Sequence, residues 1–155
     1  MTRTYPRGTG YPGYSATMTR VPEAAREARV LARVALATWG LDDVADEAAL
    51  LLSELVSNAV RHAAGHAVRV VVDRPTDERV ILAVIDQAPG RLPQMRTPGS
   101  DDASGRGLRL VDALATQWGY DLMGSGTQPR AKRVWVVLDA TRAKELSPED
   151  GGSGP

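Results

Sequence analysis

Residues 67–85 read AVRVVVDRPTDERVILAVI and contain two β-like runs separated by a turn. The runs at 67–72 and 79–85 are rich in valine and isoleucine, whose branched side chains suit the surface of a sheet. The segment DRPTD at 73–77 combines a proline with acidic residues, a composition typical of turns. This stretch therefore predicts an antiparallel hairpin.

Helical patterns lie on both sides of the hairpin. Residues 22–39 and 43–63 each repeat apolar side chains at helical spacing, and residues 106–116 do so after a long loop rich in proline and glycine. The apolar stripe of the second pattern consists of Val44, Ala48, Leu51, Leu52, Leu55 and Ala59. Further strands are expected near 15–20, at 118–123 and at 133–138.

Helices followed by antiparallel strands imply an α+β protein. We expect a two-layer α/β sandwich in which a mixed, mostly antiparallel sheet has about three helices packed on one face. The folded domain is expected at residues 16–140. Residues 1–15 and 141–155 are expected to be flexible tails, because both are rich in glycine and proline and lack apolar periodicity.

Composition excludes several classes of protein. The chain has 155 residues, with 19 Lys+Arg against 19 Asp+Glu, and this balance argues against direct nucleic-acid binding through a broad cationic face. Its apolar runs are far shorter than the roughly 18 residues that a membrane-spanning helix needs, and its N-terminus lacks the apolar segment of a secretory signal. Without cysteine there is no disulfide, thiolate zinc site or cysteine nucleophile. We therefore expect a cytoplasmic protein that does not contact membranes.

Polar side chains border the apolar stripe of residues 43–63. Glu54 and Asn58 are four residues apart and so lie on one helix face, which Arg61 and His62 continue one turn later. At that border Glu54 and Asn58 are expected to be half-buried, which suits a general base and a metal ligand. The simpler alternative is an ordinary solvated helix face.

Two further features could bind a ligand. Asp86 ends the second strand of the hairpin, a position that suits either a ligand or a turn. Gly105 and Gly107 begin the helix at 106–116, where backbone N–H groups can approach a phosphate, although a flexible loop end would look the same. The third glycine of a dinucleotide fingerprint and the lysine of a P-loop are absent here.

The chain contains, in order, a Glu-x-x-x-Asn helix, a strand that ends in Asp, a loop rich in glycine and proline, and a Gly-x-Gly helix start. This order resembles the GHKL (Bergerat-fold) ATPase superfamily, which includes the ATP-binding domains of histidine kinases, gyrases and anti-sigma serine kinases. ELVSNAVRHA at 54–63 is similar to the N box of that superfamily, DQAPG at 86–90 to its G1 box, and SGRGL at 104–108 to its G2 box. The resemblance covers about residues 15–140. These strings look most like those of the anti-sigma factor serine/threonine-protein kinase subgroup.

The resemblance implies a role for each matched residue. Glu54 would activate the attacking hydroxyl, Asn58 would bind Mg²⁺, and Asp86 would accept the amino group of adenine. Residues 91–104 would form a lid over ATP. The remaining nucleotide-binding residues would be Arg61, Gly90, Gly105, Arg106, Gly107 and Leu108.

The chain departs from the superfamily pattern at two places. Ala88 stands where the G1 box has its first glycine, and Ala131-Lys132 stands where a Gly-Thr pair precedes the last strand. A lysine there could reach a phosphate or face solvent, and we expect Lys132 to face solvent.

The resemblance implies an anti-sigma kinase that binds ATP or ADP with Mg²⁺. It would phosphorylate a serine of an anti-anti-sigma (STAS-type) protein, sequester a sigma factor and form a homodimer. A non-catalytic, nucleotide-gated binding module with the same pocket is the alternative, and the altered G1 glycine favours it. A histidine-kinase fragment is disfavoured because no helical dimerisation segment precedes the domain. A scaffold that binds no nucleotide remains the simplest alternative.

Overall fold

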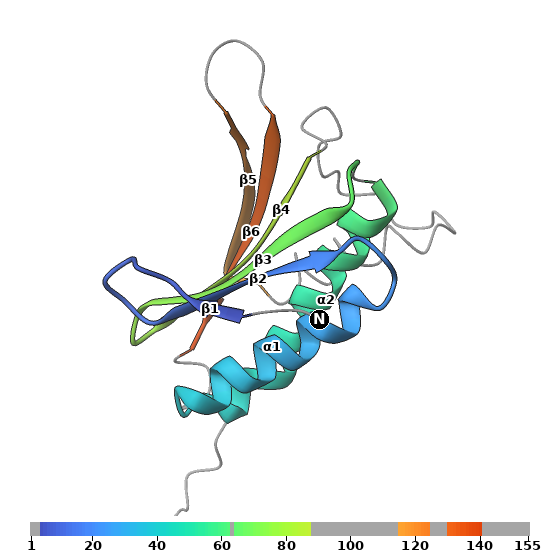
Figure 1. The fold of residues 1–155 in the computed structure, drawn as a ribbon. Helices are drawn as coiled ribbons and strands as arrows, with labels where there is room; N and C mark the ends of the chain where they lie inside the picture. Colours follow the sequence, from blue (N-terminus) through green and yellow to red (C-terminus); the bar gives the residue numbers. More distant parts are fainter. Residues whose placement is uncertain (1–3, 63, 88–114, 125–129, 141–155) are drawn as a thin grey trace, which may run out of the picture.

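The computed structural model describes residues 4–62, 64–87, 115–124 and 130–140. Over these residues the chain forms a six-stranded sheet in the order β1-β2-β3-β4-β6-β5, and two α-helices cover one face of it (Figure 1). The elements are β1 (Thr4–Pro6), β2 (Gly13–Thr19), α1 (Ala24–Thr38), the 3₁₀ helix η1 (Asp42–Val44), α2 (Ala45–His62), β3 (Ala67–Thr76), β4 (Arg79–Asp86), β5 (Gln117–Met123) and β6 (Ala131–Asp139).

The expected α+β class and two-layer α/β sandwich are confirmed. The sheet is not mixed, because every pairing between the described strands is antiparallel. Two α-helices are described where about three were expected. The third, at 106–116, lies outside the described residues except for residues 115 and 116, which are not helical. No helix in the described part of the chain is long and apolar enough to cross a membrane.

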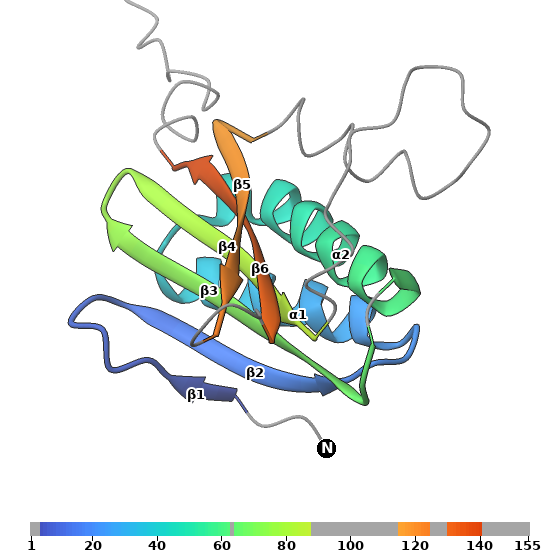
Figure 2. The same cartoon turned by 90° about the horizontal axis from the view of Figure 1, so that it is seen from above.

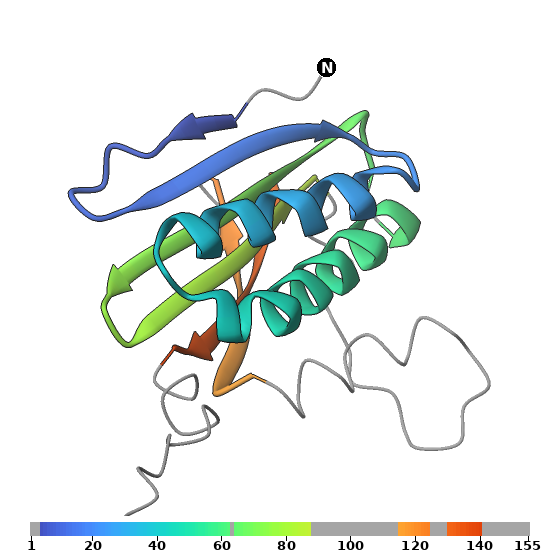
Figure 3. The same cartoon turned by 90° about the horizontal axis from the view of Figure 1, so that it is seen from below.

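The core lies between the sheet and an antiparallel pair formed by α1 and α2 (Figures 2 and 3). Side chains alternate between the two faces along each strand, and the even-numbered residues of β3, β4 and β6 face the helices. The apolar stripe predicted for α2 is confirmed, since all six of its residues are buried. The inward apolar residues of the three strands are Val68, Val70, Val72, Val80, Leu82, Val84, Val134, Val136 and Leu138.

The hairpin of β3 and β4 is confirmed, but its turn lies later than expected. Strand β3 continues to Thr76, and the turn consists of Asp77 and Glu78. The β3–β4 register shifts between Asp73 and Thr76. Pro75 lies inside this irregular stretch, where its missing N–H interrupts no regular ladder bond, so a proline here does not end the strand.

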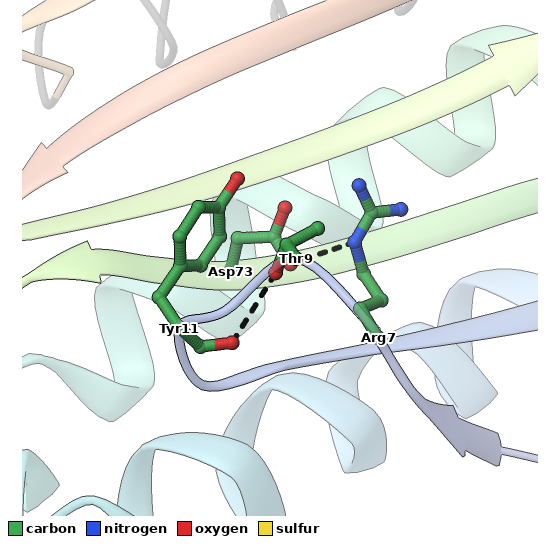
Figure 4. A network of polar contacts seen from close by, with 4 residues as sticks. All are labelled: Arg7, Thr9, Tyr11 and Asp73. Carbon is green, nitrogen blue, oxygen red and sulfur yellow. Dashed lines mark hydrogen bonds and ion pairs between the residues drawn. The ribbon is translucent and has the colours of Figure 1, made fainter.

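Residues 4–6, expected to belong to a flexible tail, form strand β1 against β2. Just after β1, the Nε atom of Arg7 lies 3.0 Å from Oδ1 of Asp73 in β3, an ion pair across the intervening strand (Figure 4). Nearby, the hydroxyl of Thr9 donates to the carbonyl oxygen of Tyr11 at 3.2 Å. Residue 13 must be glycine, because a Cβ there would collide with the Asp73 carboxylate. The N-terminal segment is therefore joined to the sheet by both backbone pairing and charge.

Burial raises the pKa of Asp73 above its ordinary value of 3.8, and the positive charges of Arg7, Arg133 and Arg69 offset only part of this effect. The folded state then holds the Asp73 proton more tightly than the unfolded state does. Stability contributed by this group is therefore present at low pH and is lost as pH rises from 3.8 through the raised folded-state pKa.

We predict that Asp73→Asn removes this loss, so that the variant gains more stability than the wild type, or loses less, as pH rises through the acidic range, because it has no proton to lose there. Urea unfolding of both proteins at a series of acidic pH values measures the two slopes. A slope that is the same with and without the carboxyl would contradict the raised pKa.

Candidate functional site

Helix α2 presents Glu54 and Asn58 at the border between its apolar stripe and solvent. Both residues are half-buried, whereas Leu51 and Leu55 beside them are buried. This is the environment that the spacing predicts. A carboxylate and a carboxamide one helical turn apart provide oxygen atoms to one small volume, and both side chains remain within reach of an approaching ligand.

The C-terminal end of α2 is held in place by Arg20, which follows β2. The Nε atom of Arg20 donates to the carbonyl oxygen of Gly65, and its Nη1 atom donates to that of Val60, both at 2.7 Å. The last carbonyl groups of a helix lack partners within the helix, and a guanidinium group satisfies them well. Arg61, one residue after Val60, is exposed. Arg20 therefore fixes the helix turn that follows Asn58.

Asp86 and Lys132 meet at one end of the sheet. Asp86 is the last residue of β4, and the register of β4 and β6 places Lys132 directly opposite it. The Nζ atom of Lys132 lies 3.5 Å from Oδ2 of Asp86, and the two side chains are only 5% and 3% exposed. Both residues have even numbers in their strands, so both belong to the face that packs against the helices.

The expectation that Lys132 faces solvent is wrong. Strand β6 begins at Ala131, two residues before the strand start expected at 133, so Lys132 lies inside the strand. It then shares the inward face with Val134 and Val136. Its charge can be buried there because the carboxylate of Asp86 lies opposite it, and a buried charge needs such a partner.

Lys132 is the site residue that the sequence interpretation missed. The alternation of side chains in β6 indicates that Lys132 faces inward. The inward residues of this strand are Leu138, Val136 and Val134, and the next inward position is residue 132. The same alternation in β4, from Leu82 and Val84, reaches Asp86. The alternation thus predicts that both charges lie on the inward face, whereas their pairing depends on the β4–β6 register.

Helix α2 packs against β4 and β6. In Figures 2 and 3 the helix and β4 run in the same direction, so the C-terminal half of α2 and the end of β4 lie at the same end of the molecule. The candidate site thus consists of two groups, the pair Asp86–Lys132 on the sheet and the pair Glu54–Asn58 on the helix layer.

Other predicted site residues lie outside the described residues. They are Gly90, Gly105, Arg106, Gly107 and Leu108, together with Ala88 and the expected lid at 91–104. Within the described part of the chain, no group of three or more His, Cys, Asp or Glu side chains could hold a metal ion. The carboxamide oxygen of Asn58 instead suits Mg²⁺, which commonly takes one or two protein oxygens and completes its shell with water and phosphate.

Comparison with known proteins identifies the family of the chain. A family model for the histidine kinase-like ATPase domain matches residues 17–133 of the chain. The matched segment runs from β2 into β6 and includes α2, Asp86 and Lys132. A search of the curated proteins found no match.

We predict that Lys132→Met lowers the free energy of unfolding by about 3 kcal/mol or more, because Asp86 would lose its ionic partner inside the protein. The double variant Asp86→Asn/Lys132→Met should recover most of that loss, since neither charge remains. Urea denaturation measures both effects. A single variant as stable as the wild type would contradict the burial of this pair.

Proposed function

The chain belongs to the histidine kinase-like ATPase domain family, and on this premise we propose that it is an ATP-binding regulatory protein of the anti-sigma serine/threonine kinase type. Family membership supports ATP or ADP as its ligand. The proposed reaction transfers the terminal phosphoryl group of ATP to a serine of an anti-anti-sigma protein with a STAS-type fold. The observation that carries the proposal is the buried Asp86 at the end of β4, at the same end of the molecule as the Glu54–Asn58 face of α2.

Asp86 is proposed to recognise adenine. Its carboxylate would accept a hydrogen bond from the 6-amino group of the base. The residue is 3% exposed, and a buried acceptor discriminates strongly because a base without a matching donor leaves it unsatisfied. The nucleotide-binding roles that the resemblance implies are proposed likewise for Arg61, Gly90, Gly105, Arg106, Gly107 and Leu108.

Glu54 and Asn58 are proposed to act on the phosphoryl group. The Glu54 carboxylate takes the proton of the serine hydroxyl as the serine oxygen bonds to the γ-phosphorus, and the bond to ADP breaks. Asn58 would hold Mg²⁺, which when bound neutralises charge on the phosphates. Half-burial suits Glu54 for this role, because the side chain remains accessible to a protein substrate.

The partner proteins are proposed from the family subgroup. A sigma factor would be sequestered, the anti-anti-sigma protein would be the phosphate acceptor, and the chain would act as a homodimer in the cytoplasm. Helix α1 offers a surface for a protein partner, because Val30 and Val34 are 56% and 59% exposed. They line an apolar groove of about 480 Å³ between α1 and strands β1 and β2.

A non-catalytic binding module is the second candidate. It would bind nucleotide in the same pocket and use it only to control binding of a partner. Ala88, in place of the first glycine of the G1 box, favours this candidate because it alters the segment directly after Asp86.

We predict that ATP and ADP raise the melting temperature of the protein and that GTP does so less. A ligand at about 100 times its Kd adds about 2.7 kcal/mol of stability. Thermal-shift titrations with and without Mg²⁺ measure the effect, and Asn58→Ala should reduce the Mg²⁺-dependent part. Indifference to every adenine nucleotide would reject the proposed function.

We further predict that Glu54→Gln abolishes phosphoryl transfer to a STAS-type protein from the same genome and leaves ADP binding intact, because the amide cannot accept the serine proton. Transfer from radiolabelled ATP and calorimetric ADP binding measure the two properties. Glu78→Gln is the matched control, since Glu78 is exposed in the turn before β4, at the end opposite Asp86.

Undiminished transfer by Glu54→Gln would exclude Glu54 as the base. A wild-type protein that binds ATP and transfers nothing to its partner would instead favour the non-catalytic module.

A further inference from the structure

The ion pair of Asp86 and Lys132 occupies inward positions where the strands otherwise place apolar residues. In β4 the preceding inward residue is Val84, and in β6 the following one is Val134. Replacing a buried ion pair with well-packed apolar residues commonly keeps or increases stability. Stability alone therefore does not account for two charges at this place.

The pair offers one hydrogen-bond acceptor and one donor side by side. The Asp86 carboxylate accepts, the Lys132 ammonium donates, and their atoms Oδ2 and Nζ are 3.5 Å apart. The two residues are opposite each other on neighbouring strands, so the backbone fixes their order across the sheet. A ligand edge with an adjacent donor and acceptor can therefore contact both groups at once.

Adenine has such an edge, because its 6-amino group donates and its neighbouring ring nitrogen N1 accepts. We propose that Lys132 is a specificity-determining residue that donates a hydrogen bond to N1 of adenine while Asp86 accepts from the 6-amino group. This inference rests on the proposed function, since it places the base at Asp86.

In this role Lys132 discriminates between nucleotide bases. A donor fixed next to Asp86 favours an acceptor at N1, because a base with a C–H group at that position cannot accept the hydrogen bond from the ammonium. Guanine presents the same two kinds of group in the reverse order, with its 6-oxo group accepting and its N1–H donating. Asp86 placed against position 6 therefore disfavours guanine.

The test compares ADP with 1-deaza-ADP, in which N1 is replaced by C–H, by isothermal titration calorimetry. The wild type should bind 1-deaza-ADP about tenfold or more weakly, as expected for loss of a hydrogen bond to a charged group. In Lys132→Met the two ligands should bind equally, and Lys132→Arg, which keeps a cationic donor, should restore a preference for ADP. Arg79→Met, an exposed change at the other end of β4, should behave like the wild type.

Because Lys132→Met leaves Asp86 without its ionic partner, the comparison is repeated in Asp86→Asn/Lys132→Met, which contains neither charge. The amide oxygen of asparagine can still accept from the 6-amino group, so the double variant should bind the two ligands equally.

The outcomes separate this inference from the proposed function. A wild type that binds ADP and 1-deaza-ADP equally, or a penalty for 1-deaza-ADP that persists in Lys132→Met and in Asp86→Asn/Lys132→Met, would overturn the role of Lys132 and leave nucleotide binding standing. Tighter binding of GDP than of ADP would overturn the proposed order of contacts. A wild type that binds no adenine nucleotide would reject the proposed function and this inference with it.

Discussion

The alternation of side chains along the antiparallel strands is the constraint on which the rest of this structure depends. The sheet has two helices on one of its faces, so each inward position of β3, β4 and β6 must be filled by a side chain that tolerates burial. Valine and leucine fill most of these positions, and that is what holds α1 and α2 in place. At the end of β4 and the start of β6 the same rule turns Asp86 and Lys132 inward, where their opposite charges offset part of the cost of burial.

The two buried aspartates show how differently a sheet can accommodate a carboxylate. Asp73 has an odd number in β3 and faces away from the helices, where the N-terminal segment covers it and supplies Arg7. Asp86 has an even number in β4 and faces the helix layer, where its partner comes from the neighbouring strand. The first pair joins a distant segment of chain to the sheet, whereas the second lies at the end of the sheet where we propose that adenine binds.

Local patterns were enough to predict the elements that depend on local spacing. The stripe of α2, the strands of the hairpin and the position of Glu54 and Asn58 at the stripe border all follow from periodicity within one element. The predictions that the structure contradicts depend on contacts between elements. Pro75 suggested a turn but lies in an irregular stretch of β3, and the contact of Arg7 with Asp73 joins residues far apart in the sequence. Lys132 is expected in solvent but lies inside β6, and its burial depends on Asp86 of the neighbouring strand.

The first strand has a consequence for how the protein can be shortened or tagged. Strand β1 covers the outer backbone of β2, and the Arg7–Asp73 contact secures it there. Truncation of the chain before Gly8 would uncover the N–H and C=O groups of β2 at Tyr14, Ser15 and Ala16, the residues that β1 pairs with. Such an open strand can pair with another molecule and begin aggregation, so an affinity tag is safer placed ahead of an intact N-terminus than in place of it.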